Sequence, residues 1–124
     1  MRTGEVALDQ TQEGVTLVEI TGEHDLGTSA DLASNLDRLI AEGRPVVVDL
    51  SAATFIDSST LGVILDARRR ALDEGVGFEL AQDGGAPAVA RVLEITGVRD
   101  ELPVRSSRPE AIAAAVGAPE ESRG

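Results

Sequence analysis

Three consecutive hydroxyl residues follow an aspartate in the segment FIDSSTLG, residues 55–62. An apolar pattern of helical spacing begins directly after them, at Leu61. Aspartate and serine are favoured helix caps, and the free N–H groups at a helix start stabilise a negative group, including a phosphate carried by a serine. The segment therefore suits either a plain helix cap or a site that accepts a phosphate. Residue chemistry alone leaves both interpretations open.

The position of this segment in the chain favours a functional role. It follows Val46–Leu50, a nearly continuous β-branched run that is typical of a central strand covered on both faces. In α/β sheets, binding sites gather where such strands end. We therefore expect the three hydroxyl groups to lie at the carboxyl edge of a sheet.

The elements around the segment alternate between strand and helix patterns. Two early strands, EVALD and Val15–Ile20, are separated by a polar turn and predict a hairpin. A capping-box variant at Thr28 predicts a helix that begins there, and Gly43 ends its pattern. The remaining patterns predict helices from Leu61 to Leu72, after Pro87 and from Pro109 to Val116, a strand at Val76–Leu80 and at best a short strand at Leu102–Val104.

This order predicts an α/β fold with a mixed β-sheet of four to five strands and about four helices packed against it. The chain has 124 residues, of which 42% are hydrophobic and 2% aromatic, as expected for one compact domain with an aliphatic core. We place this domain at residues 1–117 and expect residues 118–124 to form a mobile C-terminal tail. No apolar run approaches the roughly 18 residues of a membrane helix, and cysteine is absent, so we expect a cytoplasmic protein.

The net charge of the chain limits the classes of partner that it can bind. Twenty-two acidic residues against eleven basic ones give a formal net charge of −11. This charge repels phosphate backbones and anionic lipids, so neither nucleic acid nor membrane is an expected partner. All basic residues are arginine, which excludes Schiff-base chemistry and a phosphate-binding lysine.

Enzyme chemistry finds little support in the sequence. His24 is the only histidine, no serine lies in a nucleophile elbow, and we expect this histidine to be a solvated turn residue. Asp49 and Asp57 resemble part of a phospho-accepting receiver site, but the acidic pair and the lysine of such a site are missing. No phosphate-binding loop, dinucleotide fingerprint or metal spacing occurs. We therefore predict no enzymatic activity, no cofactor and no metal.

The whole pattern resembles the anti-sigma factor antagonists, which are single STAS domains of bacterial partner-switching circuits. Three segments carry the resemblance: GEHDL at residues 22–26, VVDL at 47–50 and, most specifically, FIDSSTLGVIL at 55–65. The order of elements agrees over about residues 5–116, whereas the motifs are confined to residues 22–65.

The resemblance implies a binding switch. In this family, the serine directly after the motif's aspartate is phosphorylated by the cognate anti-sigma factor, a serine kinase, and that serine is Ser58 here. The unphosphorylated form binds the anti-sigma factor and releases a sigma factor. A serine phosphatase restores this form, and the protein alone is expected to be a monomer or weak dimer. The expected contact surface comprises Asp25, Asp57, Ser59, Thr60, Leu61 and Gly62.

One residue departs from the family pattern, because the position after the two serines is commonly glycine and is Thr60 here. The extra hydroxyl could alter partner choice, and a kinase could use Ser59 or Thr60 instead of Ser58. An alternative function is that of a STAS subunit in a sensory or transport assembly without a sigma factor. The intact Ser58 favours the antagonist.

Overall fold

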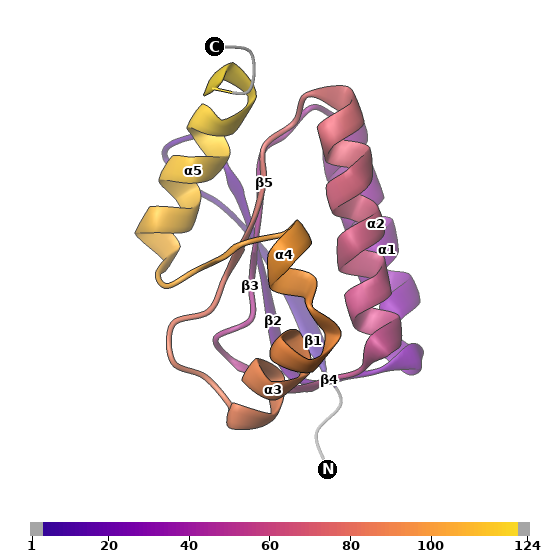
Figure 1. Cartoon of the computed structure of the whole chain (residues 1–124). Coiled ribbons are helices and arrows are strands. Elements are labelled where there is room, and N and C mark those ends of the chain that lie inside the picture. Colours follow the sequence, from indigo (N-terminus) through magenta and orange to yellow (C-terminus); the bar gives the residue numbers. More distant parts are fainter. Residues whose placement is uncertain (1–3, 122–124) are drawn as a thin grey trace.

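The computed structural model describes residues 4–121 and shows a mixed β-sheet with helices on both of its faces (Figure 1). Within this part of the chain the sheet has six strands. Five of them follow the order β1-β2-β3-β5-β6, and β4 pairs with the C-terminal residues of β2. The strands are β1 (Glu5–Gln10), β2 (Thr16–His24), β3 (Val46–Asp49), β4 (Ala53–Ile56), β5 (Phe78–Ala81) and β6 (Val104–Arg105).

Strand β2 organises the sheet because it pairs with three others. It is antiparallel to β1, which confirms the predicted hairpin. Its first half runs parallel to β3 and its last residues run parallel to β4, with Glu23 opposite Phe55 and His24 opposite Ile56. The end of β2 and the end of β4 therefore lie side by side.

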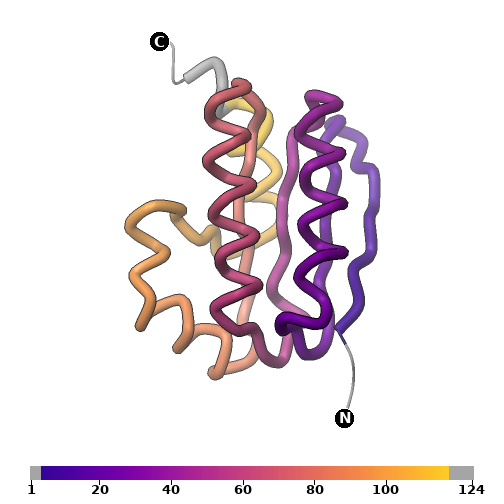
Figure 2. The backbone as a smooth tube through the Cα atoms, turned by 90° about the vertical axis from the view of Figure 1, so that its right-hand side faces the viewer, coloured from indigo at the N-terminus to yellow at the C-terminus, as the bar shows by residue number. Residues whose placement is uncertain are grey.

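Five helices surround the sheet in the described residues. Helices α1 and α2 lie side by side on one face and begin at the same end of the molecule (Figure 2), whereas α5 packs on the opposite face (Figure 1). The helices are α1 (Leu26–Ala41), α2 (Ser58–Glu74), α3 (Pro87–Thr96), α4 (Val98–Glu101) and α5 (Arg108–Glu121).

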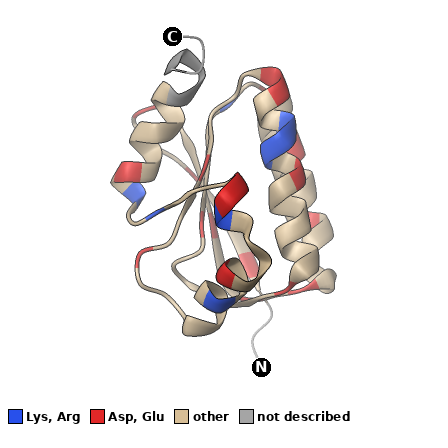
Figure 3. Cartoon of the chain, viewed as in Figure 1, with Lys and Arg blue, Asp and Glu red and all other residues tan. Residues whose placement is uncertain are grey.

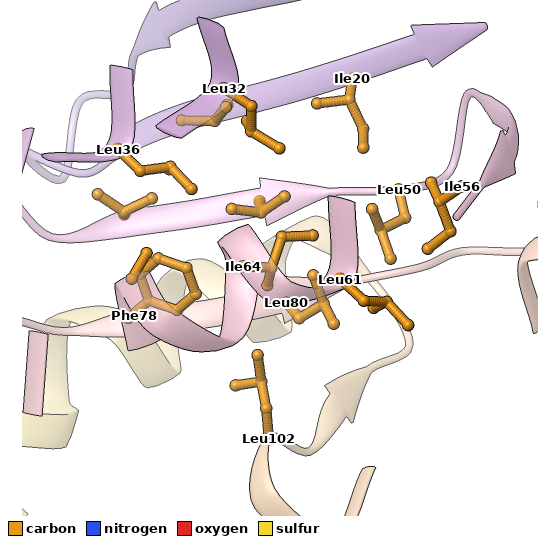
Figure 4. Close-up of a cluster of buried hydrophobic side chains, with 14 of the residues drawn as sticks. Ile20, Leu32, Leu36, Leu50, Ile56, Leu61, Ile64, Phe78, Leu80 and Leu102 are labelled. Carbon is orange, nitrogen blue, oxygen red and sulfur yellow. The ribbon is translucent and has the colours of Figure 1, made fainter. Parts of the chain in front are cut away.

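The core is aliphatic and lies mainly between the sheet and the pair α1 and α2 (Figure 4). Leu36, Ile64 and Leu80 are fully buried there, together with Phe78 as the one buried aromatic residue among those described. Burial of each such side chain stabilises the fold by about 1.5–3 kcal/mol. Under α5 the core is thinner, because Ala111 and Ala115 are the buried residues of that helix.

The fold class agrees with the sequence-based prediction, and two short elements were missed. β4 was not predicted because Thr54 and Phe55 are exposed and the strand has only four residues. α4 is a single turn that follows Gly97. Over residues 4–121 the sheet thus has one strand more than expected, and there are five helices instead of about four. The predicted mobility of residues 118–124 stays a prediction, because α5 extends to Glu121 and residues 122–124 lie outside the described part.

Candidate functional site

Asp57 is the N-cap of α2 and joins that helix to β4. The strand ends at the buried Ile56, so the chain turns into the helix at the edge of the core. Asp57 has extended backbone angles, φ −110° and ψ −176°, as an N-cap requires. Its Oδ1 accepts a hydrogen bond from the Thr60 N–H at 3.0 Å. This bond satisfies one of the free N–H groups of the first turn.

The three consecutive hydroxyl groups have different surroundings. Ser59 donates its hydroxyl to Asp57 Oδ1 at 2.7 Å, and Thr60 donates its own to the same oxygen at 3.1 Å. Thr60 is fully buried and Ser59 is half-buried. Ser58 is exposed, and its hydroxyl has no hydrogen-bond partner among residues 4–121.

These bonds set the ionisation of Asp57. Desolvation by its surroundings would raise the pKa of its carboxyl group. The hydrogen bonds from Ser59 and Thr60 outweigh this effect and hold the pKa below its usual value. Asp57 is therefore a carboxylate at neutral pH.

Asp25 caps the neighbouring helix in the same way. Its Oδ1 accepts a hydrogen bond from the Gly27 N–H at 2.9 Å, and Thr28 Oγ1 accepts one from the Asp25 N–H at 3.2 Å. These two bonds form a capping box in which Asp25 is the N-cap and Thr28 is the third residue of the helix. The sequence-based start of α1 at Thr28 was wrong, because Asp25 supplies the cap and the helix begins at Leu26.

His24, the last residue of β2, contacts both caps. The prediction that this histidine is solvated was wrong. The side chain is fully buried, with Nε2 3.0 Å from the Thr21 carbonyl oxygen and Nδ1 3.1 Å from Thr28 Oγ1. Because a carbonyl only accepts, Nε2 donates the first of these bonds. The backbone carbonyl of His24 accepts a hydrogen bond from the Asp57 N–H at 3.1 Å. The caps of α1 and α2 are thus tied to one residue of β2.

The predicted contact residues divide by exposure. Asp25 and Ser58 are exposed, and Asp57 and Ser59 are half-buried. Gly62 is half-buried too, and a side chain there would meet open space. Leu61, 3% exposed, and Thr60 point into the core beneath the start of α2. The structure therefore places all the predicted residues at the starts of α1 and α2. Thr60 and Leu61, however, are buried beneath the surface residues.

Two exposed apolar residues flank these positions and were missed by the sequence analysis. Leu26, the first residue of α1, is 76% exposed, and Phe55 in β4 is 40% exposed. Both side chains therefore offer apolar contact area beside the candidate site. Leu26 could have been found from its place directly after the cap Asp25, whereas Phe55 required knowledge of β4.

The starts of α1 and α2 each carry an acidic cap, Asp25 and Asp57. Figure 3 shows acidic and basic positions along the chain. In α2, no basic residue precedes Arg68. Among residues 4–121 no group of histidine, cysteine and acidic side chains is arranged to hold a metal ion. No helix of the described chain is long and apolar enough to cross a membrane.

Comparison with known proteins places this geometry in a family. A family model described as the STAS domain matches residues 7–111. An anti-sigma F factor antagonist of Paenibacillus polymyxa is 33% identical over 101 residues, which cover 80% of this chain and 85% of the relative.

Solved structures show the same architecture. The crystal structure of an anti-sigma factor antagonist from Mycobacterium paratuberculosis has a TM-score of 0.80 and 26% identity, covering 91% of this chain and 94% of that one. The Bacillus cell-fate determinant SpoIIAA in its phosphorylated form shares the fold with a TM-score of 0.66 and 18% identity, covering 88% and 97%. The chain therefore belongs to the STAS domain family, in which its relatives include anti-sigma factor antagonists.

Proposed function

We propose that the protein is an anti-sigma factor antagonist that acts by binding and has no catalytic activity of its own. In the cytoplasm it binds a kinase-type anti-sigma factor when Ser58 is unphosphorylated, and a sigma factor is thereby released. One observation carries the proposal: of the three hydroxyls after Asp57, that of Ser58 alone is both exposed and free of hydrogen bonds in the described chain. A kinase can reach it without disturbing the fold.

The position of Ser58 suits a switch that leaves the fold unchanged. Ser58 is the first residue of α2, where the helix dipole and free N–H groups favour a negative group. A phosphate adds about −1.5 to −2 charges at neutral pH and a tightly held hydration shell. On a contact surface that already contains Asp25 and Asp57, this opposes docking by repulsion and by the cost of desolvation.

The affinity change needed for such a switch is modest. A difference of roughly 3 kcal/mol in binding free energy changes affinity more than a hundredfold. A doubly charged group in a desolvated interface can supply that difference. A serine phosphatase then resets the protein by removing the phosphate.

The comparisons support the proposal at two levels. The relative from Paenibacillus polymyxa is named as an anti-sigma F factor antagonist and aligns with most of the chain. The structural neighbour SpoIIAA is described in a phosphorylated form, so a protein of this fold accommodates a phosphate. The net charge of −11 further disfavours nucleic acid and anionic membranes as partners.

The test begins with capture of the partner from the extract of the native cell. The recovered kinase is then incubated with ATP and the purified chain, and mass spectrometry locates the phosphate. We expect a single phosphate on Ser58, and a more than hundredfold loss of affinity for the partner. Ser58→Ala should bind normally and stay bound, and Ser58→Asp should bind more weakly than wild type but better than the phosphorylated protein.

Ser106→Ala is the matched control. Ser106 is also exposed, but it precedes α5 on the other face of the sheet, where its hydroxyl bonds to Glu110. This variant should keep both phosphorylation and binding. Full phosphorylation of Ser58→Ala would contradict the assignment of Ser58. Recovery of only transport or sensory subunits would support the alternative function of a STAS subunit in such an assembly.

A further inference from the structure

Asp57 Oδ1 accepts three hydrogen bonds, and two of them come from the hydroxyl groups of the two residues that follow Ser58. The Ser59 hydroxyl lies 2.7 Å from this oxygen and the Thr60 hydroxyl 3.1 Å. The third bond, from the Thr60 N–H, fixes the carboxylate against the helix start. The aspartate therefore does more than cap the helix, because it also holds the two neighbouring hydroxyls.

The helix geometry separates the three side chains further. Successive residues of an α-helix point about 100° apart, so three adjacent hydroxyls cannot face the same direction. Here Thr60 points into the core and is 0% exposed, while Ser59 is turned toward Asp57. Ser58 is left pointing outward.

We propose that Asp57 selects Ser58 as the phosphate acceptor by holding the hydroxyl groups of Ser59 and Thr60 against its own carboxylate. The proposal rests on the function proposed above and adds a role for three residues around Ser58. Asp57 is a positioning residue in this role, because it orients the hydroxyl groups of Ser59 and Thr60 and places a negative charge beside them.

The chemical step shows why the carboxylate discriminates. In the transfer, the serine oxygen attacks the γ-phosphorus of ATP bound to the kinase, the new oxygen–phosphorus bond forms as the bond to the β–γ bridging oxygen breaks, and ADP leaves. A base of the kinase takes the serine proton. For Ser59 the attacking oxygen first has to give up its bond to Asp57 Oδ1.

Charge adds a second barrier for Ser59. If its oxygen stayed in place, the incoming phosphoryl group would develop negative charge beside a carboxylate only 2.7 Å from that oxygen. The hydrogen bonds that lower the pKa of Asp57 keep this carboxylate ionised, so the repulsion operates at neutral pH. Ser58 lacks the bond, and its outward hydroxyl can carry the phosphate away from Asp57.

The test measures the ratio of phosphate on Ser59 to phosphate on Ser58 within the same protein. Because both sites belong to one docked molecule, the ratio does not depend on how tightly a variant binds the kinase. In wild type we expect Ser59 to carry about one phosphate in a hundred or fewer. In Asp57→Ala the ratio should rise roughly tenfold to a hundredfold, the factor that loss of a hydrogen bond to a charged group provides.

Two further variants separate the contributions of orientation and charge. Asp57→Asn keeps an oxygen that can accept the Ser59 hydroxyl and remains a favoured cap, but it removes the charge, so its ratio should fall between wild type and Asp57→Ala. Thr60→Val removes one donor and leaves the bond between Ser59 and Asp57, so its ratio should stay near the wild-type value. Circular dichroism checks that each variant is folded.

The outcomes distinguish this proposal from the function on which it rests. A wild-type protein that accepts no phosphate on residues 58–60 would overturn the proposed function and the selection with it. A wild type modified at Ser58, with an unchanged ratio in Asp57→Ala, would overturn the selection alone. A raised ratio in Asp57→Ala with a wild-type ratio in Thr60→Val supports it.

Discussion

Asp49 at the end of β3 and Asp57 at the end of β4 each accept a hydrogen bond from a serine two residues further along the chain. Ser51 Oγ lies 2.6 Å from Asp49 Oδ1, and Ser59 Oγ lies 2.7 Å from Asp57 Oδ1. The local arrangement is the same, but Asp49 is fully buried and paired with Arg108 of α5. Asp57 is half-buried, and no arginine of the described chain pairs with it.

The difference shows how one local motif serves two purposes. At Asp49 the motif is closed by tertiary contacts, since Arg108 also bonds to Glu19 and the Ser51 hydroxyl accepts the Asp83 N–H at 2.8 Å. The sheet, the loop at Asp83 and the start of α5 are thereby joined. At Asp57 the motif is completed within the first turn of α2, which leaves its outer side accessible to a partner. We therefore expect changes at Asp49 to affect stability and changes at Asp57 to affect binding.

Asp49→Ala should give the largest loss of stability. Removal of one member of a buried ion pair costs about 3–5 kcal/mol, because the other charge is left without its partner. The Arg108 side chain is 44% exposed and keeps its bond to Glu19, so the expected loss falls to about 2–3 kcal/mol. Urea unfolding at neutral pH measures it. A loss below that of Asp57→Ala would show that the pair with α5 does not stabilise the fold.

The pH dependence of stability should also differ between the two aspartates. Burial would raise the pKa of Asp49, but hydrogen bonds from Ser51 and Arg108 hold it below its usual value, as other bonds do at Asp57. A carboxyl with a lower pKa in the folded state contributes stability above its unfolded pKa, and the contribution disappears as pH falls through the folded pKa.

The measurement compares the free energy of unfolding from pH 7 down to pH 3 in wild type, Asp49→Asn and Asp57→Asn. Each variant lacks one of these carboxyl groups, so the acid-induced loss of stability should be shallower than in wild type. Because Asp49 has a charged partner and Asp57 has none, we expect the larger change in slope for Asp49→Asn. Identical slopes in all three proteins would contradict the role of both groups.

Asp57→Ala should have a smaller effect on stability. Loss of the N-cap side chain, which is also the acceptor of the buried Thr60 hydroxyl, costs about 1–2 kcal/mol, and the apolar contacts of α2 with the core remain. The same unfolding experiment checks this value, with Asp57→Asn as the control that keeps the cap. Binding to the partner should nevertheless fall in Asp57→Ala, so the order of the two aspartates reverses between stability and binding. A loss of partner binding in Asp49→Asn as large as that in Asp57→Ala would contradict the expectation that Asp49 affects stability and Asp57 affects binding.

The two regions also differ in how well the sequence predicts them. Local rules predicted the helix after Leu61 and a cap in the residues before it, because these residues are neighbours in the chain. The structure assigns the cap to Asp57 and begins the helix at Ser58. The pair between Asp49 and Arg108 joins residues 59 positions apart, and no local pattern indicates it. β4 was missed for a related reason, since its stability depends on pairing with β2 and not on its own four residues.

The exposure of individual side chains was predicted only in part. Ser58 was identified from the aspartate before it and from the family resemblance, but its sequence neighbours could not show that its hydroxyl is free while those of Ser59 and Thr60 are not. His24 was misjudged because the predicted strand ended at Ile20 and left the histidine among turn residues, whereas β2 continues to His24. Its burial depends on Thr21 and Thr28, which surround it only after β2 and α1 have packed.

Ser58→Ala should have the smallest effect on stability and provides the sharpest contrast with Ser51→Ala. Ser51 loses hydrogen bonds to Asp49 and to the Asp83 N–H, which costs about 1–2 kcal/mol. Ser58 loses none, and alanine is the better helix former, so its stability should stay within about 0.5 kcal/mol of wild type. Thermal unfolding of the two variants in parallel measures this difference. A loss above about 1 kcal/mol in Ser58→Ala would show that the Ser58 hydroxyl has a structural partner. The proposed switch would then lack the unbonded hydroxyl that is to accept the phosphate.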